Sequence, residues 1–345
     1  MRRRAWMFAF LLVVGMSACG DDDDETGDAD GGQQVAAVGL EDAFLATADA
    51  SGYRITQSVG QTMSSPALGM DTDLPLDEES PTIVGEVTPD ASHLRVDLSA
   101  ALGPVLGDDA PPIGFEIWSG PDRMVLDTRD YAALAELNPG AALGPFEPGV
   151  SFVDLDALGD ERPDLLAVLV GQGLADPGEL ADRLPEALEG VEQRGSSFTG
   201  TASYADLLET MGSDPDVIAR SAAAGVALNL AIDPDVLTDF YIEYYAATDV
   251  DITVDIGTDG SVRSLGYDVD LSGLFPVLVD QGNELGLDIP AEQLDEARDA
   301  FAETVWTVET IIRFEVVDDL QMARAPATTD DRTSEWLAFF RDGGF

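Results

Sequence analysis

The sequence predicts an α+β fold in which helices pack against one extensive antiparallel sheet. Residues 250–256 and 262–271 alternate between apolar and polar side chains on either side of a Gly-Thr-Asp-Gly turn. This pattern is typical of an antiparallel hairpin with one solvated face. Residues 304–317 repeat the alternation over a longer strand. Helix starts of the form Asp-Pro, an N-cap followed by proline at the first helical position, occur between such strands.

The other elements are predicted from the spacing of apolar residues and from turn residues. The N-terminal half is expected to contain a helix and then several strands separated by short turns and one polar loop. Strands are expected at residues 53–59, 82–88, 93–98, 115–119, 124–128 and 198–207, with a loop at 63–80. Helices are expected at residues 40–50, 164–174, 176–191, 214–225 and 233–246, and a further helix from residue 291.

The first 39 residues are typical of an exported, lipid-anchored protein. Arg2, Arg3 and Arg4 precede an apolar run that is too short to span a bilayer. Met16-Ser17-Ala18-Cys19 follows and resembles the lipobox of bacterial lipoproteins, with Met in place of the usual Leu. Cys19 is the only cysteine, so an intramolecular disulfide and a cysteine-based metal site are both excluded. The lipobox resemblance implies that Cys19 is diacylated, and two acyl chains anchor a protein stably where one does not.

These features divide the chain into four parts. We expect a lipoprotein signal peptide at 1–18, an acidic flexible tether at 19–39, a folded domain at 40–320 with a helical insertion at 272–302, and a C-terminal tail at 321–345. The folded part is long enough to bury a sizeable core. The insertion is interpreted either as a lid or as additional packing.

Composition excludes several classes of function. The chain of 345 residues has a formal net charge of −50, with 67 Asp and Glu against 17 basic residues, all of them arginine. Such a chain repels phosphate backbones, so nucleic acid is not an expected partner. A hydrophobic content of 45% is too high for a disordered acidic protein. The acidic residues are therefore expected on the surface of a folded core.

No catalytic constellation is found in the sequence. His93 is the only histidine and cannot by itself form a two-histidine metal site. The nucleophile elbow, phosphate-binding glycine loops and the zinc-protease motif are all missing. We expect neither enzymatic activity, nor a cofactor, nor a metal. A glycosidase needs only two carboxylates, so an acidic extracellular hydrolase stays as a lesser alternative.

Three further segments resemble a known family. They are Leu174–Thr210, with a helix followed by Phe198-Thr199-Gly200-Thr201-Ala202-Ser203-Tyr204, the hairpin Val254–Leu265, and Ile117-Trp118-Ser119-Gly120. Together with the lipobox, their order is similar to that of actinobacterial lipoproteins of the LppX/LprG type, within the LolA-like carriers. That resemblance implies a curved half-barrel sheet with helices on its concave side, and a cavity for acyl chains of a lipid or glycolipid. Residues 272–302 fall outside the family pattern.

The expected ligand-binding wall follows from the resemblance together with strand alternation. Alternate residues of one strand share one face. The residues expected to contact acyl chains are Ile252, Val254, Ile256, Trp306, Val308, Ile312 and Phe314. The expected partners are a lipid or glycolipid, the outer face of the cell membrane through Cys19, and a transport partner that the sequence does not identify. The main alternative is a structural or protein-interaction lipoprotein with a solid core, in which helix 233–246 fills the same space.

Overall fold

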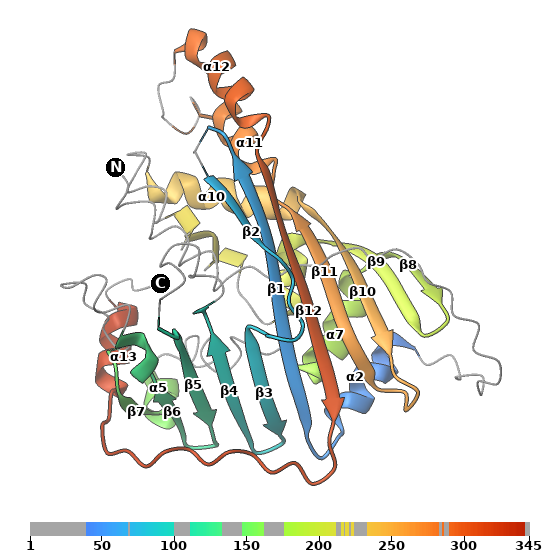
Figure 1. Cartoon of the computed structure of the whole chain (residues 1–345), viewed down its shortest axis with the longest axis vertical. Helices are drawn as coiled ribbons and strands as arrows, with labels where there is room; N and C mark the ends of the chain where they lie inside the picture. Colours follow the sequence, from blue (N-terminus) through green and yellow to red (C-terminus); the bar gives the residue numbers. More distant parts are fainter. Residues whose placement is uncertain are drawn as a thin grey trace.

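One large, open antiparallel sheet dominates the molecule (Figure 1). The computed structural model describes residues 39–67, 70–99, 111–132, 147–161, 176–211, 215–216, 218–220, 222–223, 233–282, 285 and 290–341. Within these residues the sheet has 12 strands in the order β7-β6-β5-β4-β3-β1-β12-β11-β10-β9-β8, and β2 also pairs with β1. The strands are β1 Tyr53–Ser65, β2 Met70–Leu74, β3 Ile83–Thr88, β4 Ala91–Asp97, β5 Gly114–Ser119, β6 Arg123–Asp127, β7 Val150–Asp154, β8 Glu189–Arg194, β9 Ser197–Ser203, β10 Asp249–Ile256, β11 Val262–Asp270 and β12 Val305–Val316.

Helices precede, interrupt and follow these strands. Asp176 and Asp233 cap α7 and α10 as the sequence predicts, each accepting a hydrogen bond from a backbone N–H two residues later. The helices are α2 Leu40–Ala48, α5 Leu155–Glu161, α7 Pro177–Ala187, α8 Tyr204–Thr210, α10 Pro234–Ala247, α11 Leu274–Asp280, α12 Ala291–Phe301 and α13 Thr333–Arg341, with the 3-10 turn η1 Arg129–Tyr131. The predicted α+β class with a large antiparallel sheet is therefore confirmed.

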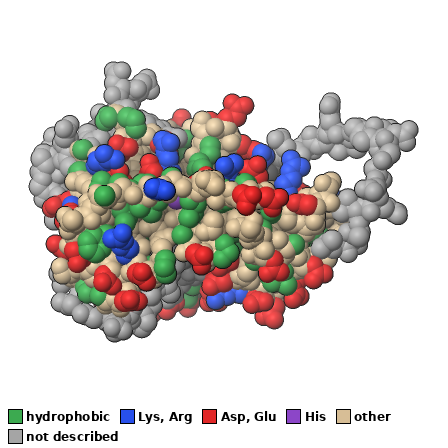
Figure 2. Space-filling view, turned by 90° about the horizontal axis from the view of Figure 1, so that it is seen from below, with side chains coloured by type: hydrophobic (Ala, Val, Ile, Leu, Met, Phe, Trp, Pro, Cys, Tyr) green, Lys and Arg blue, Asp and Glu red, His purple; other side chains and the backbone are tan. Residues whose placement is uncertain are grey.

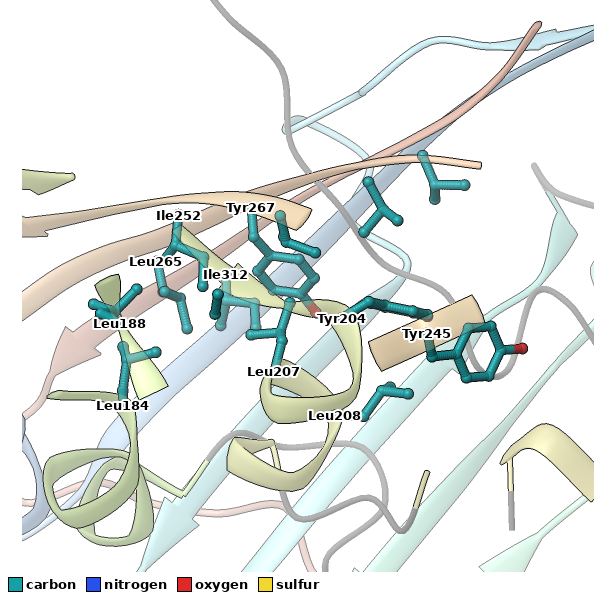
Figure 3. Packing of buried hydrophobic residues seen from close by; sticks show 14 of the residues in the cluster. Leu184, Leu188, Tyr204, Leu207, Leu208, Tyr245, Ile252, Leu265, Tyr267 and Ile312 are labelled. Carbon is teal, nitrogen blue, oxygen red and sulfur yellow. The ribbon is translucent and has the colours of Figure 1, made fainter. Parts of the chain in front are cut away.

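Most helices pack on one face of the sheet, here called the inner face. Strand registers place Ile55, Phe314, Ile312, Leu265 and Val254 on this face. These residues share a hydrophobic cluster with side chains from α2, α7, α8, α10 and α11, called the first cluster. The close packing of β10, β11 and β12 against α7 and α8 is visible in Figure 3. The opposite, outer face of the same strands carries mostly charged and hydroxylated residues.

A second, smaller cluster lies at the β7 end of the sheet. Met124, Leu126 and Val153 pack there with α5 and with Trp336 of α13. The segment before α13 follows β7: the N–H of Phe152 donates to Asp330 O, and the N–H of Arg332 donates to Phe152 O. The C-terminal segment therefore covers an edge strand whose backbone groups would otherwise be exposed.

Three predicted boundaries are wrong, each for a local reason. The loop expected at 63–80 includes the end of β1 and all of β2, a five-residue strand whose exposed Asp71 and Asp73 resemble the acidic residues of a polar loop. Helix 176–191 stops at Ala187 because β8 begins at Glu189, with exposed charged residues and no apolar alternation. Strand 198–207 ends at Ser203, whose side chain accepts from Asp206 N and starts α8. That Ser-x-x-Asp cap was a readable helix signal.

Two other expectations concern the ends and the insertion. In the described part of the chain, no helix is long and apolar enough to cross a membrane. The signal peptide, the tether with Cys19, and the helix expected at 164–174 lie outside the described residues. The insertion contains α11 and α12, which extend beyond the ends of β1 and β12 (Figure 1).

Candidate functional site

The seven residues expected to bind ligand lie on the inner face and are all buried. Ile252, Val254 and Ile256 belong to β10 and are 0–6% exposed, and the four residues on β12 are likewise 0–6% exposed. Strand β11 lies between them: Leu265 pairs with both Val254 and Ile312. Alternation thus places these side chains on a common face. Contact with a ligand stays a prediction.

Helices cover this part of the face. Leu184 and Leu207 approach Ile252, Leu265 and Ile312 in Figure 3, and all five belong to the first cluster. The wall that the sequence proposes is therefore closely packed with helix side chains. This arrangement matches the solid-core alternative at this position, because a buried side chain in van der Waals contact with its neighbours leaves no room for an acyl chain.

Aromatic residues of α8 and α10 extend the same packing. Tyr204 and Tyr245 meet edge to face with ring centroids 5.1 Å apart, and Phe240 and Tyr244 stack at 6.2 Å. Burial raises the pKa of Tyr244 to about 12, because the phenolate would lose its hydration. Burial also raises the pKa of Tyr204, Tyr241 and Tyr245. These tyrosines are neutral core residues.

The inner face continues beyond the helices onto β1, β3, β4 and β5. The registers align Gln57 with Ile83, Ile83 with Val96, and Val96 with Phe115. Several apolar side chains on this stretch are only half-buried, in contrast to those on β10 and β12. They are Val59, Ile83, Val87, Val96, Phe115 and Ile117.

This stretch lies between the two hydrophobic clusters. Val59 and Val87 border the first cluster, and Ile117 borders the second. Among the described residues, Ile83 and Phe115 belong to neither cluster. We call the half-buried stretch from β1 to β5 the central inner face. Sequence reasoning predicted each of these strands, but could not align strands whose pairing partners are far apart in the chain.

The inner positions of β1 and of β3 to β5 carry no charged side chains. On β1 the inner positions are Tyr53, Ile55, Gln57, Val59, Gln61 and Met63; on β3 to β5 they are Ile83, Gly85, Val87, Ser92, Leu94, Val96, Phe115, Ile117 and Ser119. None of these positions carries Asp, Glu or Arg. The adjacent outer positions include Arg54, Glu86, His93, Arg95 and Glu116. The charged side chains of these four strands therefore lie on the outer face, and their inner positions are apolar or uncharged.

His93 lies on the outer face in a structural contact. Its ring stacks on Trp118 with centroids 4.7 Å apart and planes within 8°. Its Nε2 is 2.8 Å from Glu116 Oε2, and its Nδ1 is 4.0 Å from Glu86 Oε2. Glu86 is also 3.5 Å from the guanidinium of Arg54. The imidazole is therefore held between carboxylates and an aromatic ring, in a position away from the inner face.

A polar pocket of about 350 Å³ lies at the ends of β4, β5 and β6. Its lining includes Arg95, Asp97, Glu116, Asp127 and Arg129. The hydrogen bond from Arg129 lowers the pKa of Asp127. None of the seven predicted residues lines this pocket. Within the described residues, no group of three or more His, Cys, Asp and Glu side chains is arranged to hold a metal ion.

Most ion pairs join side chains that are largely exposed to solvent. Arginines are interspersed with carboxylates on the surface seen in Figure 2. Arg194 and Glu192, for example, are 2.8 Å apart with side chains 82% and 62% exposed. Such pairs contribute little to stability because water and salt screen them.

Comparisons with known proteins give structural likenesses but no match by sequence. No protein-family profile matches the chain, and no curated protein matches it. Among solved structures, the chain is similar to the crystal structure of LprF from Mycobacterium bovis, at 10% sequence identity and a TM-score of 0.26. The match covers 84% of this chain and 95% of that chain.

Proposed function

We propose that the protein is a lipoprotein of the cell envelope that binds the acyl chains of a lipid or glycolipid. Its anchor is the acylated Cys19 at the outer face of the cell membrane. Its binding surface is the inner face of the sheet, above all the central inner face between the two hydrophobic clusters. The bound lipid is held for transport or for presentation to a partner in the envelope.

The observation that carries this proposal is the half-burial of a continuous apolar surface. Ile83, Val96 and Phe115 are half-buried on strands whose inner positions carry no Asp, Glu or Arg. The chain has 67 acidic residues, and some of them would be expected on this surface if it faced water. An apolar ligand explains why they are kept away, because burying an ionised carboxylate is costly.

The energetics suit an acyl chain. Each methylene transferred from water to this surface contributes about 0.8 kcal/mol, and the ordering of chain and side chains offsets part of that gain. A chain of many methylenes therefore binds usefully without a single strong polar contact. The nonspecific character of this term also explains why no cluster of ionisable residues marks the site.

A second candidate function is supported by the burial of the wall first expected from the sequence. Val254 and Ile312 are both 0% exposed and packed by helices. A structural or protein-interaction lipoprotein with a solid core would have this packing over its entire inner face. Both candidates are binding functions and assign no catalytic role to His93, which lies on the outer face beside Glu116.

Native mass spectrometry of a soluble form tests the proposal. The chain carrying Cys19→Ala would be purified without detergent from two unrelated hosts. Co-purifying masses in the range of lipids, released by organic extraction, are the expected result. An apo mass from both hosts, with no uptake of an added environment-sensitive dye such as N-phenyl-1-naphthylamine, would favour the solid core instead.

A further inference from the structure

The two margins of the sheet differ in how they are covered. Strands β7 and β8 end the strand order and lie at opposite margins in Figure 1. The C-terminal segment runs along β7 and exchanges backbone hydrogen bonds with Phe152. Within the described residues no strand pairs with the free side of β8, and all six residues of β8, Glu189–Arg194, are exposed. The sheet therefore has one covered margin and one open margin.

The open margin presents the backbone groups of Gln193. Arg194 pairs with Ser197 across the two-residue turn Gly195-Ser196, in which Gly195 has a φ of +65°. The pair that closes such a turn exchanges both of its backbone hydrogen bonds, and the next residue along the strand directs its N–H and C=O to the other side. Gln193 therefore directs its N–H and C=O away from β9 and toward the open margin.

The charges of β8 change sign across Gln193. Glu192 precedes it and Arg194 follows it, and the registers place both side chains on the outer face. Charged side chains on an edge strand usually oppose pairing with another chain. Here the two signs fit a second copy of the same strand: antiparallel pairing centred on Gln193 places each Glu192 opposite Arg194 of the other copy.

Other registers lack this match. The ladder between β8 and β9 shifts between Glu189 and Glu192, so the regular part of β8 that is available for pairing is Glu192–Arg194. A pairing centred on Glu192 would oppose two carboxylates, and one centred on Arg194 would oppose two guanidinium groups. Like charges directly opposite each other destabilise a strand pair. Among these three residues, the register centred on Gln193 is the one that gives two pairs of opposite charge.

We propose that β8 is a self-association surface through which two copies of the chain form an antiparallel strand pair, with the two-fold axis at Gln193. The N–H of each Gln193 donates to the C=O of the other, and each Glu192 forms an ion pair with Arg194 of the other copy. The two sheets then continue through β8 with their inner faces on the same side. Val191, an apolar residue 45% exposed, lies beside the new seam.

The charge of the chain makes this dimer weak and dependent on salt. A net charge of −50 opposes the approach of two copies. At physiological ionic strength the Debye length is about 8 Å, so repulsion between distant surface charges is screened while charges in contact still attract. The pairing segment is short, and a small interface of this kind is typical of reversible association.

Sedimentation velocity of the Cys19→Ala chain tests this over a range of protein concentrations at physiological ionic strength. We expect a reversible equilibrium between monomer and dimer. Glu192→Arg places arginines opposite each other, and Arg194→Glu places carboxylates opposite each other. Each single variant should raise the dissociation constant of the dimer by at least ~tenfold. An equimolar mixture of the two variants should dimerise like the parent, because every arginine of one chain then faces a glutamate of the other.

A backbone variant and two charge controls complete the test. Gln193→Pro removes the N–H at the two-fold axis and should abolish the dimer with unchanged circular dichroism, because that N–H faces away from β9. Arg54→Glu and Glu315→Arg make the same charge changes in an ion pair on the outer face of β1 and β12, in the middle of the sheet. Both controls should keep the dissociation constant of the parent.

Three results would overturn the inference. They are a parent that stays monomeric at every concentration, a mixture of the two charge variants that does not dimerise, and a dimer that the β8 variants and the controls affect equally. The self-association does not depend on lipid binding, so its failure would leave the proposed function intact.

Discussion

The hydroxyl of Thr47 on α2 accepts a hydrogen bond at 2.9 Å from the backbone N–H of Val262, the first residue of β11. The same hydroxyl donates to Ala43 O at 3.0 Å. Thr47 and Val262 are both 0% exposed. One threonine thus joins the first helix of the domain to a strand that follows 215 residues later.

Thr47→Val should destabilise the protein by about 1–3 kcal/mol, because it leaves the buried N–H of Val262 without an acceptor while keeping the volume of the side chain. The free energy of unfolding in urea measures this. Thr238→Val is the matched control: Thr238 is a buried helical threonine whose hydroxyl donates only to Pro234 O in its own helix. A control as destabilising as Thr47→Val would contradict the role of the link between α2 and β11.

Cys19→Ser should move the protein from the membrane fraction into the medium. Cys19 is the only thiol available for acylation, and loss of two acyl chains removes the stable anchor. Immunoblots of membrane pellets and culture medium measure the distribution. A mutant that still pellets with membranes after a high-salt wash would show that Cys19 is not the anchor.

Two glutamine substitutions should separate the closed and the half-buried parts of the inner face. Val254→Gln buries an unpaired amide at a 0% exposed position and should cost roughly 1–3 kcal/mol or more. Ile83→Gln, at a half-buried position, should cost less stability and reduce lipid uptake. Melting temperature and bound lipid are measured together on each variant. Val305→Gln, at a 45% exposed position on the outer face of β12, is the control.

The reverse pattern would relocate the site. If Val254→Gln abolished lipid uptake while the melting temperature held, the ligand would bind against β10 and β12. If neither variant changed the amount of bound lipid, the inner face would not be the binding surface.

Stability should fall steeply as the pH rises above about 10. Burial raises the pKa of Tyr244 to about 12 and also raises the pKa of Tyr204, Tyr241 and Tyr245. A tyrosine in the unfolded chain ionises near pH 10, so in that range the folded state binds more protons than the unfolded state. The stabilisation is complete below the unfolded pKa and is lost as the pH climbs toward the folded values.

Parallel measurement of phenolate absorbance and circular dichroism checks this pH dependence. The buried tyrosines should ionise together with the loss of structure. Tyr245→Phe should make the decline shallower, since it removes one of the linked protons. Gradual ionisation of all tyrosines with unchanged circular dichroism would contradict the burial of this cluster.

Particular elements illustrate how far sequence reasoning reaches. The hairpin of β10 and β11 and the long strand β12 were predicted because one of their faces is buried and the other wet, which produces strict alternation. Strand β8 was missed because all six of its residues are exposed, so no alternation exists to read. Helix α8 was missed although Ser203 and Asp206 form a recognisable cap.

The candidate site was only partly predictable for a related reason. Alternation fixes which residues of one strand share a face, so it placed Val254 with Ile252 and Trp306 with Val308. It does not fix which strands become neighbours or which helix covers them. The structure pairs β1 with both β12 and β3, and thereby brings the half-buried Ile83 beside Gln57 on the inner face.

The sequence by itself determined the α+β class, the two-faced strands and the caps of α7 and α10, because these depend on side chains within a few positions of one another. It also determined that Cys19 is the only residue available for a thioether anchor. Tertiary structure alone decided that helices close the inner face over Val254 and leave it half-buried over Ile83. It also decided that Trp306 and Thr310 are buried there without partners. Burial and hydrogen-bond pairing depend on contacts between segments far apart in the chain, and no local pattern records those contacts.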